Sequence, residues 1–268
     1  MSDICLITYI GGKHYAKDFI VSTLDYSKTT YIELFGGSGK ILFNKQKHTI
    51  EIYNDINYNL YSLFYTVKNY PNEFLNRIKY TLYCENIFRY YKDYIPTDII
   101  DNAVKAFIIY NMSFSGMGNT YRYGFIKNFA TQFINKLNGL SSLSNRLKDV
   151  EILNKDFREV LKSIETEEDI MLYADPPYYG TEHYYNGAGE YFGIEEHRIL
   201  AEYLNNAKYS VAISYYYFDG IEELYPKNKW NYLSYEITNR VPKSYQHRTR
   251  KKELLLTNYQ TGDIGLYD

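Results

Sequence analysis

The chain has 268 residues, of which 45% are hydrophobic and only two are cysteine, so it can form one large domain, or one domain with an insert, without disulfide bridges. The cysteines and the five histidines show no metal-ligand spacing, and the first residues resemble no signal peptide, so we expect no metal site, no membrane span and a cytoplasmic location. A net charge of −2 and a pI near 6.2 argue against a strongly basic nucleic-acid binder but allow a local basic patch.

A strand, a glycine turn and a helix follow one another early in the chain. The apolar strand is predicted at 31–35, and the helix begins with Ile41-Leu42-Phe43. Glycines let a ligand approach the backbone and a helix N-terminus offers free N–H groups, which is typical of a nucleotide-binding loop. The spacing matches neither G-x-G-x-x-G nor a Walker loop, and an ordinary connection is the alternative. The turn consists of Gly36, Gly37, Ser38, Gly39 and Lys40.

Two charged residues stand on either side of this turn in the sequence. Lys13 follows two glycines and precedes a helix predicted from about His14, where a cation is unfavourable unless it serves a ligand; a plain surface lysine is the alternative. A second strand is predicted at 50–55 and ends at Asp55, whose carboxylate can accept hydrogen bonds from a ribose. Capping of the helix that starts near Asn57 is the alternative role for Asp55.

The segment 57–149 departs from the α/β pattern, because no clear strand is predicted in it before Val150. So long a segment exceeds one crossover between parallel strands, and we therefore expect an inserted helical subdomain. Its loop 113–130 is rich in glycine, aromatic residues and cations, among them Arg122 and Lys127. This loop suits entry into a DNA groove, and an exposed loop with buried aromatic anchors is the alternative. The helices are predicted at 57–69, 71–80, 84–92, 97–115 and 132–148.

The second α/β part contains the stretch with the clearest chemistry. After a strand at 150–153 and a helix at 157–165, an apolar strand at 170–174 ends where two prolines stop the hydrogen-bond ladder. In open α/β sheets ligands bind at the carboxyl ends of such strands. The alternative is an acidic turn with a tyrosine that fills the core. The tetrapeptide that follows the strand is Asp175-Pro176-Pro177-Tyr178.

These residue types suit the activation of an exocyclic amino group on a base, which is a poor nucleophile because its lone pair is delocalised into the ring. The carboxylate of Asp175 and the backbone carbonyl of Pro176 can each accept one amino hydrogen. The nitrogen then becomes tetrahedral, with its lone pair directed outward. Tyr178 offers a flat face on which a base can stack.

The last third of the chain completes the α/β pattern. A loop at 179–192 can act as a lid, and a closing strand is predicted at 253–259. The most basic segment, 238–252, suits contact with phosphates, and a solvated loop is the alternative. Between the loop and the basic segment we predict a helix at 194–205, a strand at 209–214 and a short helix at 219–225. The cations of the basic segment are Arg240, Lys243, Arg248, Arg250, Lys251 and Lys252.

Taken in order, six motifs resemble the Dam-like, DPPY-type (D12 class) adenine-N6 DNA methyltransferases: Y-I-G-G-K, E-L-F-G-G-S-G, N-D-I-N, N-K-D-F, D-P-P-Y and K-E-L-L-L-T-N-Y. The resemblance implies an α/β, Rossmann-like fold with a mostly parallel seven-stranded sheet whose last strands are antiparallel, and an inserted helical target-recognition subdomain. It implies methyl transfer from S-adenosylmethionine to adenine N6 in a specific double-stranded DNA sequence, with base flipping. In this interpretation 1–56 and 150–268 form the catalytic domain and 57–149 the target-recognition domain.

The resemblance also implies roles for individual residues. The flipped adenine would contact Asp175, Pro176, Pro177 and Tyr178, and the DNA would contact Arg122, Lys127, Arg240, Lys243, Arg248 and Arg250. The cofactor would contact Tyr9, which stands where relatives often have tryptophan, and Lys13, Phe35, Gly36, Gly37, Ser38, Gly39, Asp55, Asp156, Phe157 and Asp175. Within this set Asp55 would hold the ribose, and Asp156 and Phe157 the adenine of the cofactor.

The sequence leaves several points open. Partners expected are double-stranded DNA and, in a restriction–modification system, a cognate restriction endonuclease; an orphan or phage enzyme is equally consistent with the residues. Rival functions are methylation of another planar nitrogen, such as cytosine N4, an RNA base or a protein amide, and DNA binding without catalysis. Relatives with those other substrates more often have Ser or Asn in place of Asp175.

Overall fold

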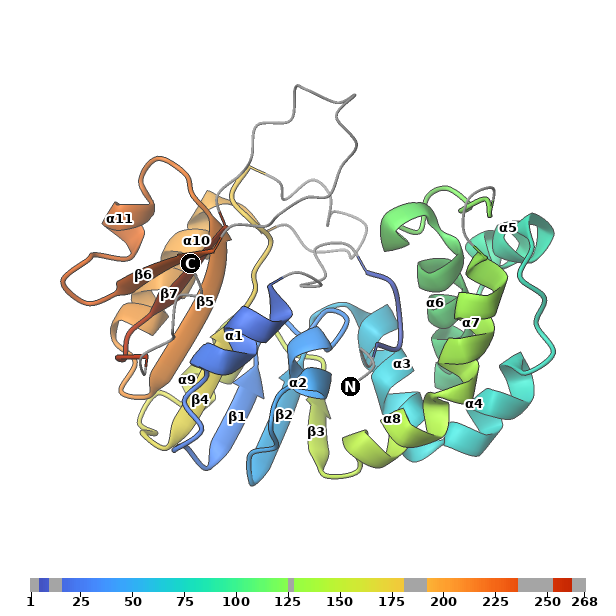
Figure 1. The fold of residues 1–268 in the computed structure, drawn as a ribbon, viewed down its shortest axis with the longest axis horizontal. Helices are drawn as coiled ribbons and strands as arrows, with labels where there is room; N and C mark the ends of the chain where they lie inside the picture. The colour runs from blue at the N-terminus through green and yellow to red at the C-terminus, as the bar shows by residue number, and fades with distance from the viewer. Residues whose placement is uncertain (1–4, 10–15, 125–127, 181–191, 236–252, 262–268) are drawn as a thin grey trace. The chain divides into compact units, whose positions relative to one another are not determined.

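A computed structural model of the chain describes residues 5–9, 16–124, 128–180, 192–235 and 253–261. Its strands form one seven-stranded sheet in the order β3-β2-β1-β4-β5-β7-β6 (Figure 1). β4 is parallel to β1 and β5, and β2 is parallel to β3, whereas β7 is antiparallel to β5 and β6. This confirms the predicted α/β class and the mostly parallel sheet with antiparallel last strands. The strands are β1 Thr30–Glu33, β2 Ile50–Asn54, β3 Val150–Leu153, β4 Ile170–Ala174, β5 Ser210–Tyr216, β6 Asn231–Tyr235 and β7 Glu253–Thr257.

The chain divides into two compact units. The first comprises 1–12, 36–45 and 51–155, and the second comprises 13–35, 46–50 and 156–268. In the first unit α6 is the central helix, because it packs against α3, α4, α5 and α7. Its helices are α2 Lys40–Asn44, α3 Tyr58–Asn69, α4 Pro71–Ile78, α5 Glu85–Asp93, α6 Ile99–Met112, the 3-10 turn η1 Phe114–Gly116, α7 Phe129–Asn138 and α8 Leu140–Leu147.

Two helix predictions in this unit are wrong in detail. The helix predicted at 132–148 is two helices, because Gly139 ends α7 by donating its N–H to the Asn135 carbonyl and α8 begins at the next residue. α7 also starts early, at Phe129, because the side chain of Asn128 caps it by accepting from the Thr131 N–H. The helix predicted at 97–115 ends at Met112, after which the chain forms η1.

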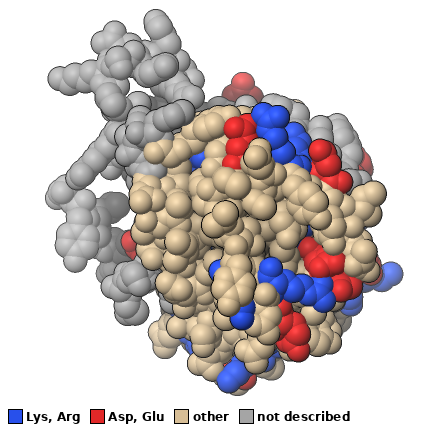
Figure 2. Space-filling model, turned by 90° about the vertical axis from the view of Figure 1, so that its right-hand side faces the viewer, with Lys and Arg blue, Asp and Glu red and all other residues tan. Residues whose placement is uncertain are grey.

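Two arginines on the helices of the first unit form ion pairs with neighbouring acids. On the face seen in Figure 2, Lys and Arg side chains lie beside Asp and Glu side chains. Arg77 pairs with Asp98 and Asp101, and Arg89 pairs with Glu85 one turn away on α5. These cations are therefore already engaged within the chain, and they add little to a surface that would attract DNA phosphates.

The second unit has its core along β4 and β5. All five residues of β4 are buried, as expected for a central strand of a sheet, and the Tyr173 hydroxyl lies 2.9 Å from the Ser214 hydroxyl of β5. β6 is a strand that the sequence did not predict. Among the described residues, no helix combines the length and apolar character needed to span a membrane. The helices of this unit are α1 Lys17–Thr23, α9 Phe157–Ser163, α10 Ile194–Asn205 and α11 Ile221–Leu224.

Candidate functional site

The turn after β1 requires glycine at several positions. The Gly36 N–H donates to the Asn54 carbonyl of β2 (2.8 Å), so the turn lies against the neighbouring strand. A Cβ on Gly36 would lie 2.1 Å from the ring of Tyr53, which is fully buried and whose hydroxyl donates to the Gly37 carbonyl (2.7 Å). Gly37 and Gly39 have φ angles of +52° and +65°, which other residues adopt only with strain. Glycine at position 36 therefore leaves room for the Tyr53 ring, and glycine at 37 and 39 permits the left-handed backbone of the turn.

Asp55 is tied to the glycine turn. Its Oδ2 accepts a hydrogen bond from the Gly37 N–H (2.7 Å), and its Oδ1 accepts one from the Asn57 N–H (2.8 Å). Burial raises the pKa of Asp55 to about 6, although both backbone hydrogen bonds act to lower it. The alternative role as helix cap is wrong, because Asn57 caps α3 by accepting from the Asn59 N–H (3.0 Å).

Tyr9 lies beside the glycine turn to which Asp55 is hydrogen-bonded. A Cβ on Gly37 would lie 3.5 Å from the Tyr9 ring, so the ring is in close range of the turn. The ring of Tyr110 packs edge-to-face against Tyr9 at 5.3 Å, and its hydroxyl accepts from the Asn57 side-chain amide (3.2 Å). Sequence reasoning missed the supporting roles of Asn57 and Tyr110. Asn57 had a signal, since it ends the N-D-I-N motif, whereas Tyr110 lies within a helix of ordinary apolar spacing. The first unit thus brings together Tyr9, Gly36, Gly37, Ser38, Gly39 and Asp55.

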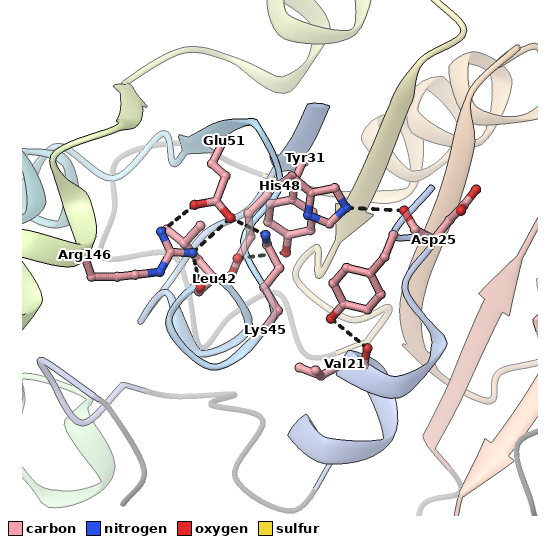
Figure 3. A network of polar contacts seen from close by, with 10 residues as sticks. Val21, Asp25, Tyr31, Leu42, Lys45, His48, Glu51 and Arg146 are labelled. Carbon is pink, nitrogen blue, oxygen red and sulfur yellow. Dashed lines mark hydrogen bonds and ion pairs between the residues drawn. The ribbon is translucent and has the colours of Figure 1, made fainter. Parts of the chain in front are cut away.

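A buried ion network holds α2, the helix that follows the glycine turn (Figure 3). Glu51 of β2 is 3% exposed and forms ion pairs with Lys45 and Arg146. Arg146 of α8 also donates to the Leu42 carbonyl of α2 (2.8 Å). Burial alone would raise the pKa of Glu51, but hydrogen bonds from Arg146 and Lys45 lower it below its usual value. The network therefore holds α2 in place, and Lys45 and Arg146 both depend on the carboxylate of Glu51 as their anionic partner.

In the second unit, the predicted tetrapeptide directly follows β4. The register of β1 and β4 pairs Glu33 with Tyr173, and the Leu34 N–H donates to the Tyr173 carbonyl (3.0 Å). Phe35 and Asp175 are each two residues beyond this pair, so they emerge at the same carboxyl edge. The Phe35 ring packs against Phe157 (5.7 Å) and Phe192 (5.6 Å), which forms an aromatic cluster beside that edge.

Tyr178 is held at both ends of its side chain. Its hydroxyl donates to Oε1 of Glu253, the first residue of β7, at 2.8 Å. Its ring packs edge-to-face against Tyr216 of β5, with centroids 4.5 Å apart. Tyr178 is 9% exposed and Glu253 4% exposed. Sequence reasoning gave Glu253 no role in the site, although it is the acid of the K-E-L-L-L-T-N-Y motif and follows a run of basic residues.

Asp156 has a partner on its own helix. It caps α9 by accepting from the Arg158 N–H (2.8 Å), and the Arg158 guanidinium donates to both carboxylate oxygens (2.7 and 2.6 Å). The hydrogen bonds from Arg158 lower the pKa of this carboxyl. A carboxylate has about four acceptor positions, so contact with a ligand stays a prediction.

Among the predicted DNA contacts, Arg122 lies in the described part of the chain. The guanidinium of Arg122 lies 3.7 Å from the centre of the Phe129 ring and donates to the Asn111 carbonyl (3.4 Å), so it already has partners inside the first unit. Its DNA contact stays a prediction. Lys13, Lys127, Arg240, Lys243, Arg248 and Arg250 lie outside the described residues.

The family model for D12 class N6 adenine-specific DNA methyltransferases matches residues 9–246. The chain belongs to this family. It is therefore an enzyme that methylates adenine N6 in DNA. The match covers both the glycine turn and the D-P-P-Y tetrapeptide, and a search of the curated proteins gave no match. The candidate site residues of this methyltransferase form two clusters, one around the glycine turn and Asp55 and one around Asp175 and Tyr178.

Proposed function

We propose that this methyltransferase transfers the methyl group of S-adenosylmethionine to N6 of adenine in one specific double-stranded DNA sequence, after the target base has been flipped out of the duplex. The observation that supports this most is the D-P-P-Y tetrapeptide at the carboxyl end of buried β4, with the ring of Tyr178 held in place. We assign catalysis to 1–56 and 150–268, and reading of the DNA sequence to 57–149, where the helices α3–α8 lie.

The residues around the glycine turn fit the cofactor. Gly37 and Gly39 give the turn its left-handed backbone and Gly36 lets it pack against Tyr53, so these three residues place no side chain of their own between the backbone and a ligand. The Asp55 carboxylate suits the two hydroxyls of a ribose, and the Tyr9 ring suits stacking on an adenine. The proposal further assigns cofactor contacts to Lys13, Phe35, Ser38, Asp156, Phe157 and Asp175.

The protein's part in the reaction is to orient the amino group. When bound, S-adenosylmethionine supplies an electrophilic methyl group on a sulfonium. Asp175 and the Pro176 carbonyl each accept one hydrogen of N6, which directs the nitrogen lone pair outward, and Tyr178 stacks on the ring. Extrusion of the base costs a few kcal/mol, and much of the rate acceleration comes from positioning. The chain needs no strong general base, because the amine becomes acidic only once it is methylated.

The proposal is tested by methyl transfer from tritiated S-adenosylmethionine to unmethylated DNA. We expect the label in N6-methyladenine after digestion to nucleosides, and methylation-aware sequencing of DNA from expressing cells should show one modified sequence. DNA that was already methylated in those cells is the matched control and should accept no label. Label in N4-methylcytosine, in RNA or in protein would contradict the proposal, as would binding of DNA without transfer.

The pKa of Asp55 gives a prediction for cofactor affinity. Ribose hydroxyls donate to the ionised carboxylate, so below about pH 6 binding must first displace a proton from Asp55. We expect the dissociation constant for S-adenosylmethionine to rise by up to about tenfold per pH unit below 6 and to be constant above it. Calorimetry across pH 4.5–8 measures this.

Two variants at this position sharpen the test. Asp55→Asn has no titrating carboxyl, so its affinity should vary little with pH. Asp55→Ala should weaken binding by about 1–3 kcal/mol at pH 7.5, the cost of leaving polar groups of the ligand without an acceptor. A pH profile shared by the wild type and Asp55→Asn would assign the titration to another group.

A further inference from the structure

A buried hydrogen bond joins the D-P-P-Y tetrapeptide to the closing strand β7. The Tyr178 hydroxyl donates to Glu253 over 2.8 Å, although the two residues are 75 positions apart in the sequence. Both belong to the second unit. Glu253 is 4% exposed, so the position of its side chain is set by the surrounding protein and not by solvent.

The backbone at Glu253 is fixed by the sheet. Glu253 pairs with Tyr216 of β5 and with Tyr235 of β6, so it lies between two strands. Tyr216 is also the residue whose ring packs edge-to-face against Tyr178, with an interplanar angle of 78°. The same pair of strand ends therefore supplies the hydrogen bond to the Tyr178 hydroxyl and the edge-to-face contact with its ring.

A tyrosine side chain has two principal torsions, and the two contacts restrict both. The edge-to-face packing restricts where the ring lies, and the hydrogen bond at the far end of the side chain restricts the tilt of its plane. A stacking surface that is already in place loses no conformational freedom when the base arrives. This matters most in a reaction whose rate depends on the direction of one nitrogen lone pair.

We propose that Glu253 is a positioning residue, whose carboxylate holds the Tyr178 hydroxyl and thereby sets the ring plane on which the target adenine stacks. The proposal rests on the proposed function, since it assumes that Tyr178 is the stacking residue. Glu253 acts only through Tyr178 and needs no contact with the DNA or the cofactor. A residue with this role should affect the rate of transfer within the bound complex more than the binding of either substrate.

The test compares Glu253→Ala, Glu253→Gln and Tyr178→Phe with the wild type in single-turnover methyl transfer. Glu253→Ala should slow the maximal rate by about tenfold, with the KM for DNA and the affinity for S-adenosylmethionine within about twofold of wild type. Glu253→Gln keeps an acceptor oxygen at the same place and should stay within about threefold of the wild-type rate. Tyr178→Phe keeps the ring but not the hydroxyl, and should slow the reaction about as much as Glu253→Ala.

A double-mutant cycle distinguishes a positioning role through Tyr178 from a loss of activity caused by disturbed folding. On the Tyr178→Phe background, neither Glu253→Ala nor Glu253→Gln should slow transfer further, because the contact is already lost. If Glu253→Ala does not fold, Tyr178→Phe decides alone, since a Tyr178→Phe enzyme with the wild-type maximal rate would overturn the proposal. Rate losses that multiply in the double variants would overturn the proposal, as would a Glu253→Ala enzyme with the wild-type maximal rate.

A matched control comes from a second buried tyrosine contact in the same unit. Ser214→Ala removes the hydroxyl beside Tyr173, at the core of β4 and β5. It should lower the melting temperature without changing the maximal rate. A wild-type enzyme that forms no N6-methyladenine would overturn the proposed function itself. An active wild type whose maximal rate is unchanged by substitution of Glu253 would overturn only the role of this residue.

Discussion

Replacing Asp175 with alanine is expected to slow methyl transfer by about 10³-fold, or about 4 kcal/mol of transition-state free energy. The carboxylate is the charged acceptor for one N6 hydrogen, and the Pro176 carbonyl alone cannot direct the lone pair. The fold should survive, because Asp175 lies just past the end of β4 and is only partly buried. Single-turnover rates with saturating DNA and cofactor measure the effect directly, and thermal unfolding reports whether the variant is native.

An acid at the opposite end of the same strand provides the control for Asp175. Asp169 directly precedes β4, is exposed, and accepts a hydrogen bond from the Thr29 N–H (2.9 Å). Asp169→Ala removes a carboxylate of the same kind far from the carboxyl edge, so its transfer rate should match the wild type. A rate for Asp175→Ala within tenfold of wild type would show that this carboxylate does not orient the amino group.

The core strands and the tetrapeptide could be predicted because the residues that specify each of them are neighbours in the sequence. β4 is a continuous apolar run whose five residues are all buried, and the prolines that end it adjoin the acid and the aromatic ring. β6 was missed because its sequence, N-Y-L-S-Y, is neither a strict alternation of polar and apolar residues nor a continuous apolar run, and it spans only five positions at the edge of the sheet. A short edge strand of this kind resembles a loop in composition.

Other features depend on contacts that a linear pattern does not contain. Apolar residues continue at helical spacing through Leu137, Leu140 and Leu143. The sequence pattern therefore predicts one continuous helix and does not reveal the break at Gly139. The choice between Asp55 and Asn57 as helix cap is decided by which side chain reaches the free N–H groups of α3. The Glu253 contact with Tyr178 joins residues on two strands that only the folded sheet brings together.

The largest loss of stability is expected for Glu51→Ala, at about 3–5 kcal/mol of the free energy of unfolding. The substitution leaves two cations without their anion: the Lys45 side chain is fully buried and the Arg146 side chain is 12% exposed. Removal of one member of a buried ion network is costly because the remaining charges lose both solvent and partner. Urea denaturation at pH 7 measures the change, and the cofactor affinity of the folded fraction should fall with it, since the network also holds α2 behind the glycine turn.

An exposed pair of the same residue types, Arg89 and Glu85 on α5, is the control. Glu85→Ala should change stability very little, because solvent screens both groups. The pH dependence gives a second check on Glu51. Its pKa in the folded protein is below its usual value of 4.5, so its contribution is present above that pH and is lost as the pH falls through the folded pKa. Glu51→Ala should therefore lack part of the acid destabilisation of the wild type, and the two stability curves should converge at low pH. Curves that stay parallel would mean that Glu51 stabilises the protein by packing and not by charge.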